Sequence, residues 1–259
     1  MSKYMDNPQN INENNINNSA PIDNTTYQRP TSLLGALSVI QRFYIIESKS
    51  TEDLPKDYFT LQQIWDFFKT GFKSGFIESL LFFTMLTFLQ TIYPSFKLYF
   101  FNAPLTEEEK FILNLISFSP LVISTIFLIF LTKYYKGAVT KRALGSLFLG
   151  RSVAFAIKGS IVYILLMWLA HKSYSDPNFI YSWISAFGWL IELFVPYKIN
   201  QEFLYMYFYK FIIPALTITA KEILYSMVFF ALLPFFTLFL KGIINRKKQI
   251  DNLKAYEEY

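Results

Sequence analysis

The sequence predicts an all-α protein, a polytopic bundle of transmembrane helices. Apolar residues make up 53% of the 259 residues, aromatic residues make up 20%, and the mean hydropathy is +0.29. Charged residues are only 17%, whereas soluble domains usually contain ~25%. One water-soluble core could not bury this much apolar surface, and several apolar blocks are long enough to cross a bilayer. We therefore expect a protein that lies in lipid.

The first 75 residues are expected to lie on the cytoplasmic side of the membrane. Residues 1–30 are rich in Asn and show no apolar period, which predicts a disordered tail. Apolar residues then recur at helical spacing over 33–46, but this run of about 14 residues is shorter than the ~20 that a span needs. A second apolar stripe over 61–72 continues into the first span. We expect two amphipathic helices within residues 31–75.

Residues 76–240 are expected to form the transmembrane bundle, with six spans preferred and four as the alternative. The last apolar block, 203–240, would be roughly 57 Å long as one straight helix, far longer than the hydrocarbon core is thick. We therefore expect it to fold back at Lys221–Glu222 into two spans. The other expected spans are 76–93, which Pro94 would end, 111–131, 152–170 and 179–195.

The distribution of basic residues predicts that both termini are cytoplasmic. Lys and Arg without any acid occupy the connector between the second and third spans, and residues 241–259 form a charged tail that begins with several basic residues. The connector after the first span instead carries Glu107, Glu108 and Glu109. Basic connectors stay on the cytoplasmic side of a membrane. The bias toward Asn, Ile, Lys and Phe indicates an AT-rich genome, so we expect a bacterial cytoplasmic (inner) membrane.

Five ionisable residues in or near the expected spans are the candidate functional residues. At the centre of a span each would cost at least ~2.5–3.5 kcal/mol if it faced lipid alone. The six-span topology places four of them near the cytoplasmic boundary, which predicts the pairs Lys158–Glu192 and Lys210–Glu78. Such an intramembrane charge cluster is either a structural clasp or part of a solute path, and lysines near a boundary also reach headgroups unaided. The five residues are Glu78, Arg151, Lys158, Glu192 and Lys210.

Small residues predict where helices pack closely. Gly145 and Gly150 shortly precede the third expected span and Gly159 lies within it, and all three would let a neighbouring helix approach. The segment 145–152 has the spacing of a phosphate-binding loop, but it follows a basic connector rather than a strand, so we expect no nucleotide site. The motif from Gly71 to Gly75 lies at the entry of the first span, where we expect only a weak role in helix association.

The residues that are missing restrict the chemistry. The chain has no Cys and one His, His171, so thiolate nucleophiles, Cys-ligated metals, His-based metal sites and catalytic triads are not expected. We expect no enzymatic activity, no cofactor, no metal and no nucleic-acid partner.

Three functional hypotheses remain. The first is a non-catalytic subunit or assembly factor of a larger membrane complex, such as secretion, motility or envelope machinery, with lipid and other membrane proteins as partners. The second is a small-solute transporter or channel component that uses the charge cluster. The third is a membrane-embedded enzyme acting on lipid, which ranks last because Glu78 and Glu192 lack a nearby nucleophile or metal in the sequence pattern.

Overall fold

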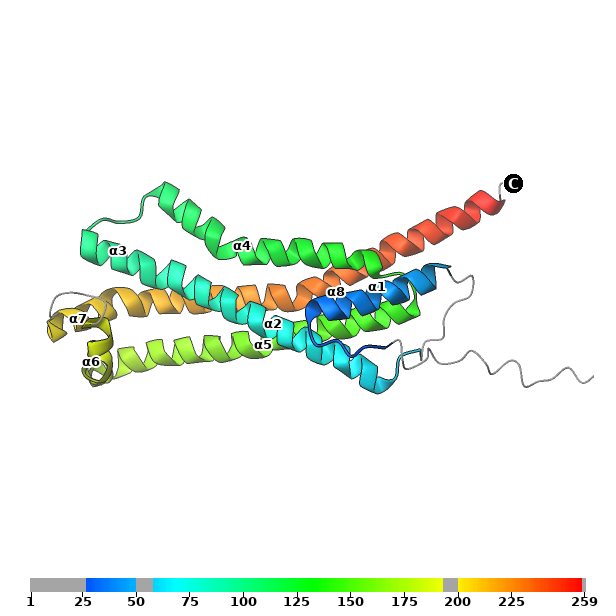
Figure 1. Cartoon of the computed structure of the whole chain (residues 1–259). Coiled ribbons are helices and arrows are strands. Elements are labelled where there is room, and N and C mark those ends of the chain that lie inside the picture. Colours follow the sequence, from blue (N-terminus) through cyan, green and yellow to red (C-terminus); the bar gives the residue numbers. More distant parts are fainter. Residues whose placement is uncertain (1–26, 50–57, 193–199, 258–259) are drawn as a thin grey trace, which may run out of the picture.

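Long helices form the body of the protein. The computed structural model describes residues 27–49, 58–192 and 200–257, and the regular secondary structure in these ranges is helical. Four of the described helices are long and apolar enough to cross a membrane, and they lie lengthwise beside one another (Figure 1). The predicted all-α fold with helices of transmembrane length is confirmed. Six spans are not confirmed, and the number found equals the alternative of four. The four helices are Leu61–Leu98, Glu107–Tyr134, Ala138–Ser175 and Gln201–Asn252.

The first long helix continues through the proline that was expected to end it. It consists of α2 (Leu61–Thr87), the π-helical turn η2 (Phe88–Ile92) and α3 (Tyr93–Phe101). The prediction that Pro94 ends this span is wrong. Proline lacks the N–H that an α-helical turn needs, and the wider π turn that ends two residues before Pro94 lets the helix proceed.

The last long helix repeats this arrangement and also overturns a prediction. It consists of α7 (Gln201–Tyr207), the π turn η4 (Phe208–Ile212) and α8 (Ile213–Glu257), with Pro214 as the second residue of α8. α8 runs through Lys221 and Glu222, so the predicted fold-back there is wrong. The length argument failed because it assumed that the whole apolar block lies in lipid. Its C-terminal part packs on a protein core, and the expected charged tail continues α8 as helix.

The expected fourth span is a short helix at one end of the molecule. The helix α6 (Pro177–Glu192) has 16 residues, or about 24 Å, which is less than the thickness of the hydrocarbon core. Its Ile180 and Ile184 pack against Leu204 of α7 and Ile213 of α8. Residues 193–195, which complete the expected span, lie outside the described part of the chain.

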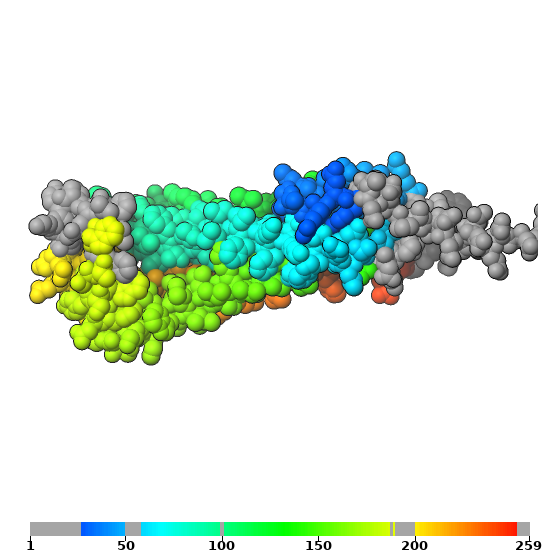
Figure 2. Space-filling model, turned by 60° about the horizontal axis from the view of Figure 1, so that its bottom comes forward, coloured from blue at the N-terminus to red at the C-terminus, as the bar shows by residue number. Residues whose placement is uncertain are grey.

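The opposite end holds a second core, on which the N-terminal helix α1 (Leu33–Lys49) packs. Figure 2 shows α1 lying on the first part of α2. Its apolar side is buried among residues of α2, of α5 (Ala138–Ser175) and of the last turns of α4 (Glu107–Leu131), so this helix contacts protein. The Glu47 carboxylate accepts hydrogen bonds from the backbone N–H groups of Gly137 at 3.1 Å and Val139 at 2.7 Å. It thereby caps the N-terminus of α5, whose free N–H groups attract an anion.

Part of the segment expected as a disordered tail packs on α2. Arg29 pairs with the Asp66 carboxylate at 3.1 Å, and the Tyr27 hydroxyl donates to the Gln63 carbonyl oxygen at 3.4 Å. Burial, together with the negative charge of Asp66, raises the pKa of Tyr27 to about 12. The phenol therefore stays protonated at neutral pH and remains a donor. The rest of the tail, residues 1–26, lies outside the described residues.

Candidate functional site

The site begins where α2 and α5 touch through glycines. The two helices run parallel, and their contact brings backbone against backbone. A methyl group added to Gly75 would place its carbon 2.6 Å from the Arg151 carbonyl oxygen. Methyl groups on Gly71 and Gly150 would overlap backbone carbonyl oxygens of the facing helix still more severely. These three positions admit only glycine, and they hold α2 and α5 at close range.

The packing glycines only partly follow the expectation from the sequence. Gly150 lies in the α2–α5 contact, and a carbon added to Gly159 would lie 2.6 Å from Cγ of Met227 on α8. Gly145 faces open space instead. The motif from Gly71 to Gly75, expected to be weak, lies at the closest contact. Its four-residue spacing was the available signal, and it was discounted because the bundle was expected to begin at residue 76.

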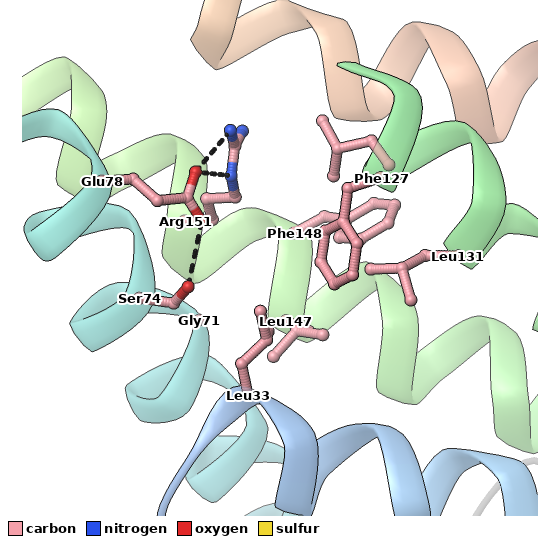
Figure 3. A pocket seen from close by; sticks show the side chains of 10 residues that line it. Leu33, Gly71, Ser74, Glu78, Phe127, Leu131, Leu147, Phe148 and Arg151 are labelled. Atoms are coloured by element: carbon pink, nitrogen blue, oxygen red, sulfur yellow. Dashed lines mark hydrogen bonds and ion pairs between the residues drawn. The ribbon is translucent and has the colours of Figure 1, made fainter. Parts of the chain in front are cut away.

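An ion pair lies one turn beyond this contact. Glu78 follows Gly75 by three residues and so shares its side of α2. Arg151 donates from Nη2 at 2.8 Å and from Nε at 3.0 Å to one carboxylate oxygen of Glu78 (Figure 3). The other oxygen accepts from the Ser74 hydroxyl at 3.0 Å. Ser124 of α4 donates to Glu78 at 3.3 Å and also contacts Arg151. We call Ser74, Glu78, Ser124 and Arg151 the ionic clasp, because they join three helices.

The environment of Arg151 strengthens the clasp. Its side chain is only 6% exposed, and its guanidinium carbon lies 4.8 Å from the ring centre of Phe155 and 5.7 Å from that of Phe230. Nη1 is buried without an acceptor among the described residues. A guanidinium cannot lose its proton, and charge interactions are stronger in a poorly solvated site. The Glu78 carboxylate is therefore the group that makes the burial of Arg151 tolerable.

The remaining predicted charges are dispersed. The Lys158 ammonium donates to the Phe76 carbonyl oxygen at 3.0 Å and lies 3.8 Å from the centre of the Phe76 ring. Lys210 is exposed in η4, at the end of the molecule where α6 and α7 lie, so the predicted Lys210–Glu78 pair does not form. Glu192 is the last residue of α6, and its side chain lies outside the described part. The predicted Lys158–Glu192 pair is therefore untested.

Two charged residues in the middle of the apolar block 203–240 were missed as candidates. Lys221 is exposed, whereas Glu222 is half-buried and its Oε2 atom has no hydrogen-bond partner in the described part of the chain. They could be recognised in the sequence, since they are the only charges in the apolar stretch 211–240. They were interpreted as a turn rather than as intramembrane residues.

A second polar layer lies nearer the α6 end of the bundle. Gln90 of η2 donates to the Asn114 side chain at 2.7 Å and to the Ser117 hydroxyl at 3.2 Å. The hydroxyl groups of Thr91 and Thr219 share a hydrogen bond, which connects η2 with α8. Uncharged groups thus join the first long helix to α4 and α8, whereas the clasp joins it to α4 and α5. Hydrogen bonds of this kind hold helices together in lipid.

The cavity beside the clasp is small. Figure 3 shows Glu78 and Arg151 on one side of it, with Phe127, Leu147 and Phe148 among the apolar side chains around it. Its space suffices for about one water molecule. The clasp is therefore suited to fixing helices, while a solute would not fit beside it.

Neither a set of metal ligands nor similarity to a known protein assigns an activity to the site. Within the described ranges, no group of three or more His, Asp or Glu side chains is placed to hold a metal ion. No protein-family model, curated protein or solved structure matches the chain. The geometry of the clasp and the surfaces of the long helices are the features from which a function follows.

Proposed function

We propose that the protein is a non-catalytic subunit or assembly factor of a larger membrane complex, of the kind found in secretion, motility or envelope machinery. The observation that carries this proposal is the closed ionic clasp. Glu78 and Arg151 pair with each other, and serine hydroxyls bond to both, beside a cavity with room for about one water molecule. Charges that serve a solute path instead face a wet cavity.

We further propose four spans in a bacterial cytoplasmic membrane, with both termini cytoplasmic. From Glu78 to Lys97 the first helix measures roughly 29 Å, which matches a hydrocarbon core of ~30 Å. Lys97 pairs with Glu109 at the level of the α3–α4 loop. The basic α4–α5 connector and the basic C-terminal part of α8 lie together at the opposite end, beside α1 (Figure 1). Basic segments on one side favour that side as cytoplasmic.

In this arrangement the N-terminal helix belongs to the cytoplasmic face. α1 and the first turns of α2 form a protein-packed body below the bilayer, and they leave large apolar side chains outward. Leu34 is 77% exposed and Leu61 is 80% exposed. Exposed apolar residues beside a membrane suit contact with a partner protein or with the headgroup region.

Purification in a mild detergent tests the proposal. The full chain, tagged at its C-terminus and expressed at its native level, is expected to bring down at least one membrane protein in fixed stoichiometry. An unrelated multi-pass protein with the same tag is the control for carry-over of lipid and abundant proteins. Recovery of the chain alone, from membranes in which it is intact, contradicts the proposal.

The alternative function, transport of a small solute, is favoured by one observation. The Glu222 carboxylate has a buried oxygen without a partner in the described residues, and it lies one turn from Thr219 in the second polar layer. Reconstituted vesicles test this alternative. Proton or ion flux that Glu222→Gln abolishes, at unchanged protein level, would favour transport over the subunit role.

A further inference from the structure

One face of α8 directs polar side chains outward at a membrane depth where lipid offers them no hydrogen-bond partner. Lys221 is exposed, and Tyr225, one turn further along, is 72% exposed. Residues four apart share a side of a helix. Apolar side chains continue this stripe, including Ile218, which is 61% exposed, and Leu232, also 61% exposed. We call these four residues the α8 outer face.

The depth of Lys221 follows from the second polar layer. Thr219 is hydrogen-bonded to Thr91, which lies six residues before Lys97 at the outer limit of the apolar region. Because α8 runs antiparallel to α2, Lys221 is two residues deeper than Thr219. It therefore lies roughly 12 Å inside that limit, and Tyr225 lies roughly 18 Å inside it. The two residues stand on either side of the midplane of a core that is ~30 Å thick.

No described group of the same chain neutralises Lys221. It forms no ion pair with any described residue. Glu222 is adjacent in sequence, but successive helical residues point in different directions, and Glu222 is half-buried where Lys221 is exposed. The Tyr225 hydroxyl likewise has no hydrogen-bond partner within the described ranges. An ammonium facing lipid at this depth costs at least ~2.5 kcal/mol.

We propose that the α8 outer face binds a transmembrane helix of a partner protein, and that an Asp or Glu in the membrane-spanning part of that helix pairs with Lys221. Tyr225 donates a second hydrogen bond to the same carboxylate. This inference rests on the proposed subunit role and specifies the chemistry of one partner. A carboxylate is the group that both outward donors fit, because an ammonium and a phenol one turn apart can each bind one of its oxygens.

A second copy of this chain is not the expected occupant. Symmetric pairing about an axis along the membrane normal brings identical faces together at equal depth. That would place Lys221 against Lys221, which is repulsive in a poorly solvated site.

Site-specific photocrosslinking tests the proposal in the full chain in native membranes. A photoreactive residue at Ile218 or Leu232 is expected to give one discrete adduct with a protein that carries Asp or Glu within a span. Lys221→Leu is expected to lower the adduct yield by about tenfold or more, because it strands the partner's carboxylate in lipid. Lys221→Arg, which keeps the charge, is expected to retain the adduct. A photoreactive residue at Ile164 of α5, which is 63% exposed, is the matched control and is expected to give no such adduct.

Charge exchange completes the test. Lys221→Glu is expected to abolish the adduct, and a Lys in place of the partner's carboxylate is expected to restore it. Three results would overturn the inference: an adduct of two copies of this chain, an adduct that Lys221→Leu does not weaken, or a partner without an intramembrane acid. If detergent purification yields a stoichiometric partner but the α8 outer face gives no adduct, this inference fails while the subunit role stands. If no partner is recovered by either method, both fail.

Discussion

The ionic clasp is asymmetric in its chemistry. Arg151 is a cation with five N–H donors, whereas Glu78 supplies only acceptors. Glu78 is also less enclosed, with 32% of its side chain exposed against 6% for Arg151. Removal of the acid therefore strands a buried cation, while removal of the base leaves an acid that is partly exposed.

This asymmetry predicts the order of stability among clasp variants. Glu78→Leu is expected to lower the free energy of unfolding by about 3–5 kcal/mol, as when a buried pair loses one partner. Arg151→Met is expected to cost less, and the double variant is expected to be more stable than Glu78→Leu alone. Denaturant titration of the purified chain in detergent micelles measures all three. Equal losses of stability in the two single variants, with a loss in the double variant equal to their sum, would show that the two residues do not interact.

The sequence predicted the members of the clasp better than its pairing. Glu78 and Arg151 were recognisable as charges close to one membrane boundary, because depth along a helix follows from residue number. The choice of Lys210 as the partner of Glu78 rested on the fold-back at Lys221, which the continuous helix α8 contradicts. Ser124 carried no signal, since a serine in an apolar helix usually hydrogen-bonds its own backbone.

At the level of whole helices, the contact of α2 with α5 sets the position of the clasp. Gly150 is expected to be intolerant of substitution, because a methyl group there overlaps the α2 backbone. Gly150→Ala should lower stability by about 1–3 kcal/mol and separate Glu78 from Arg151. Gly145→Ala is the matched control on the same helix, because its site is open, and it should gain about 0.5–1 kcal/mol from helix propensity. Thermal unfolding in detergent compares them, and equal effects would contradict the glycine contact.

The attachment of α1 depends on a cap that no sequence pattern indicated, because Glu47 and α5 lie far apart in the chain. Glu47→Ala removes the acceptor of several N–H groups at the start of α5. It should cost about 0.5–2 kcal/mol, as the loss of a helix cap does, and loosen α1. Amide hydrogen exchange of α1 is expected to accelerate in this variant. Gln41→Ala, on the exposed side of α1, should leave exchange unchanged, and equal acceleration in both variants would argue against the cap.

For the whole molecule, the apolar blocks predicted where helices lie but not how many cross the membrane. The length of an apolar block indicates the number of spans only when the whole block lies in lipid. The 203–240 block instead passes from the α6 end of the bundle into the core beneath α1, where Leu233 and Leu238 pack. Two intramembrane charges in the middle of that block resemble a turn in sequence alone. Thr219 lies beside Thr91 and Met227 lies beside Gly159. These contacts on either side of the two charges distinguish a continuous helix from a hairpin.

The natural absence of cysteine makes this topology directly measurable. Single cysteines can be labelled in intact cells with a membrane-impermeant maleimide. With four spans, Glu202→Cys is expected to react from outside and Lys221→Cys to stay unlabelled, because α7 lies at the outer end and Lys221 lies in lipid. With six spans the pattern is reversed, since residue 202 would be cytoplasmic and residue 221 would lie in an external turn. Glu108→Cys and Lys247→Cys serve as the external and cytoplasmic controls, because both topologies place them alike. Labelling at 221 and protection at 202 would therefore overturn the four-span arrangement, and with it the depth of the α8 outer face.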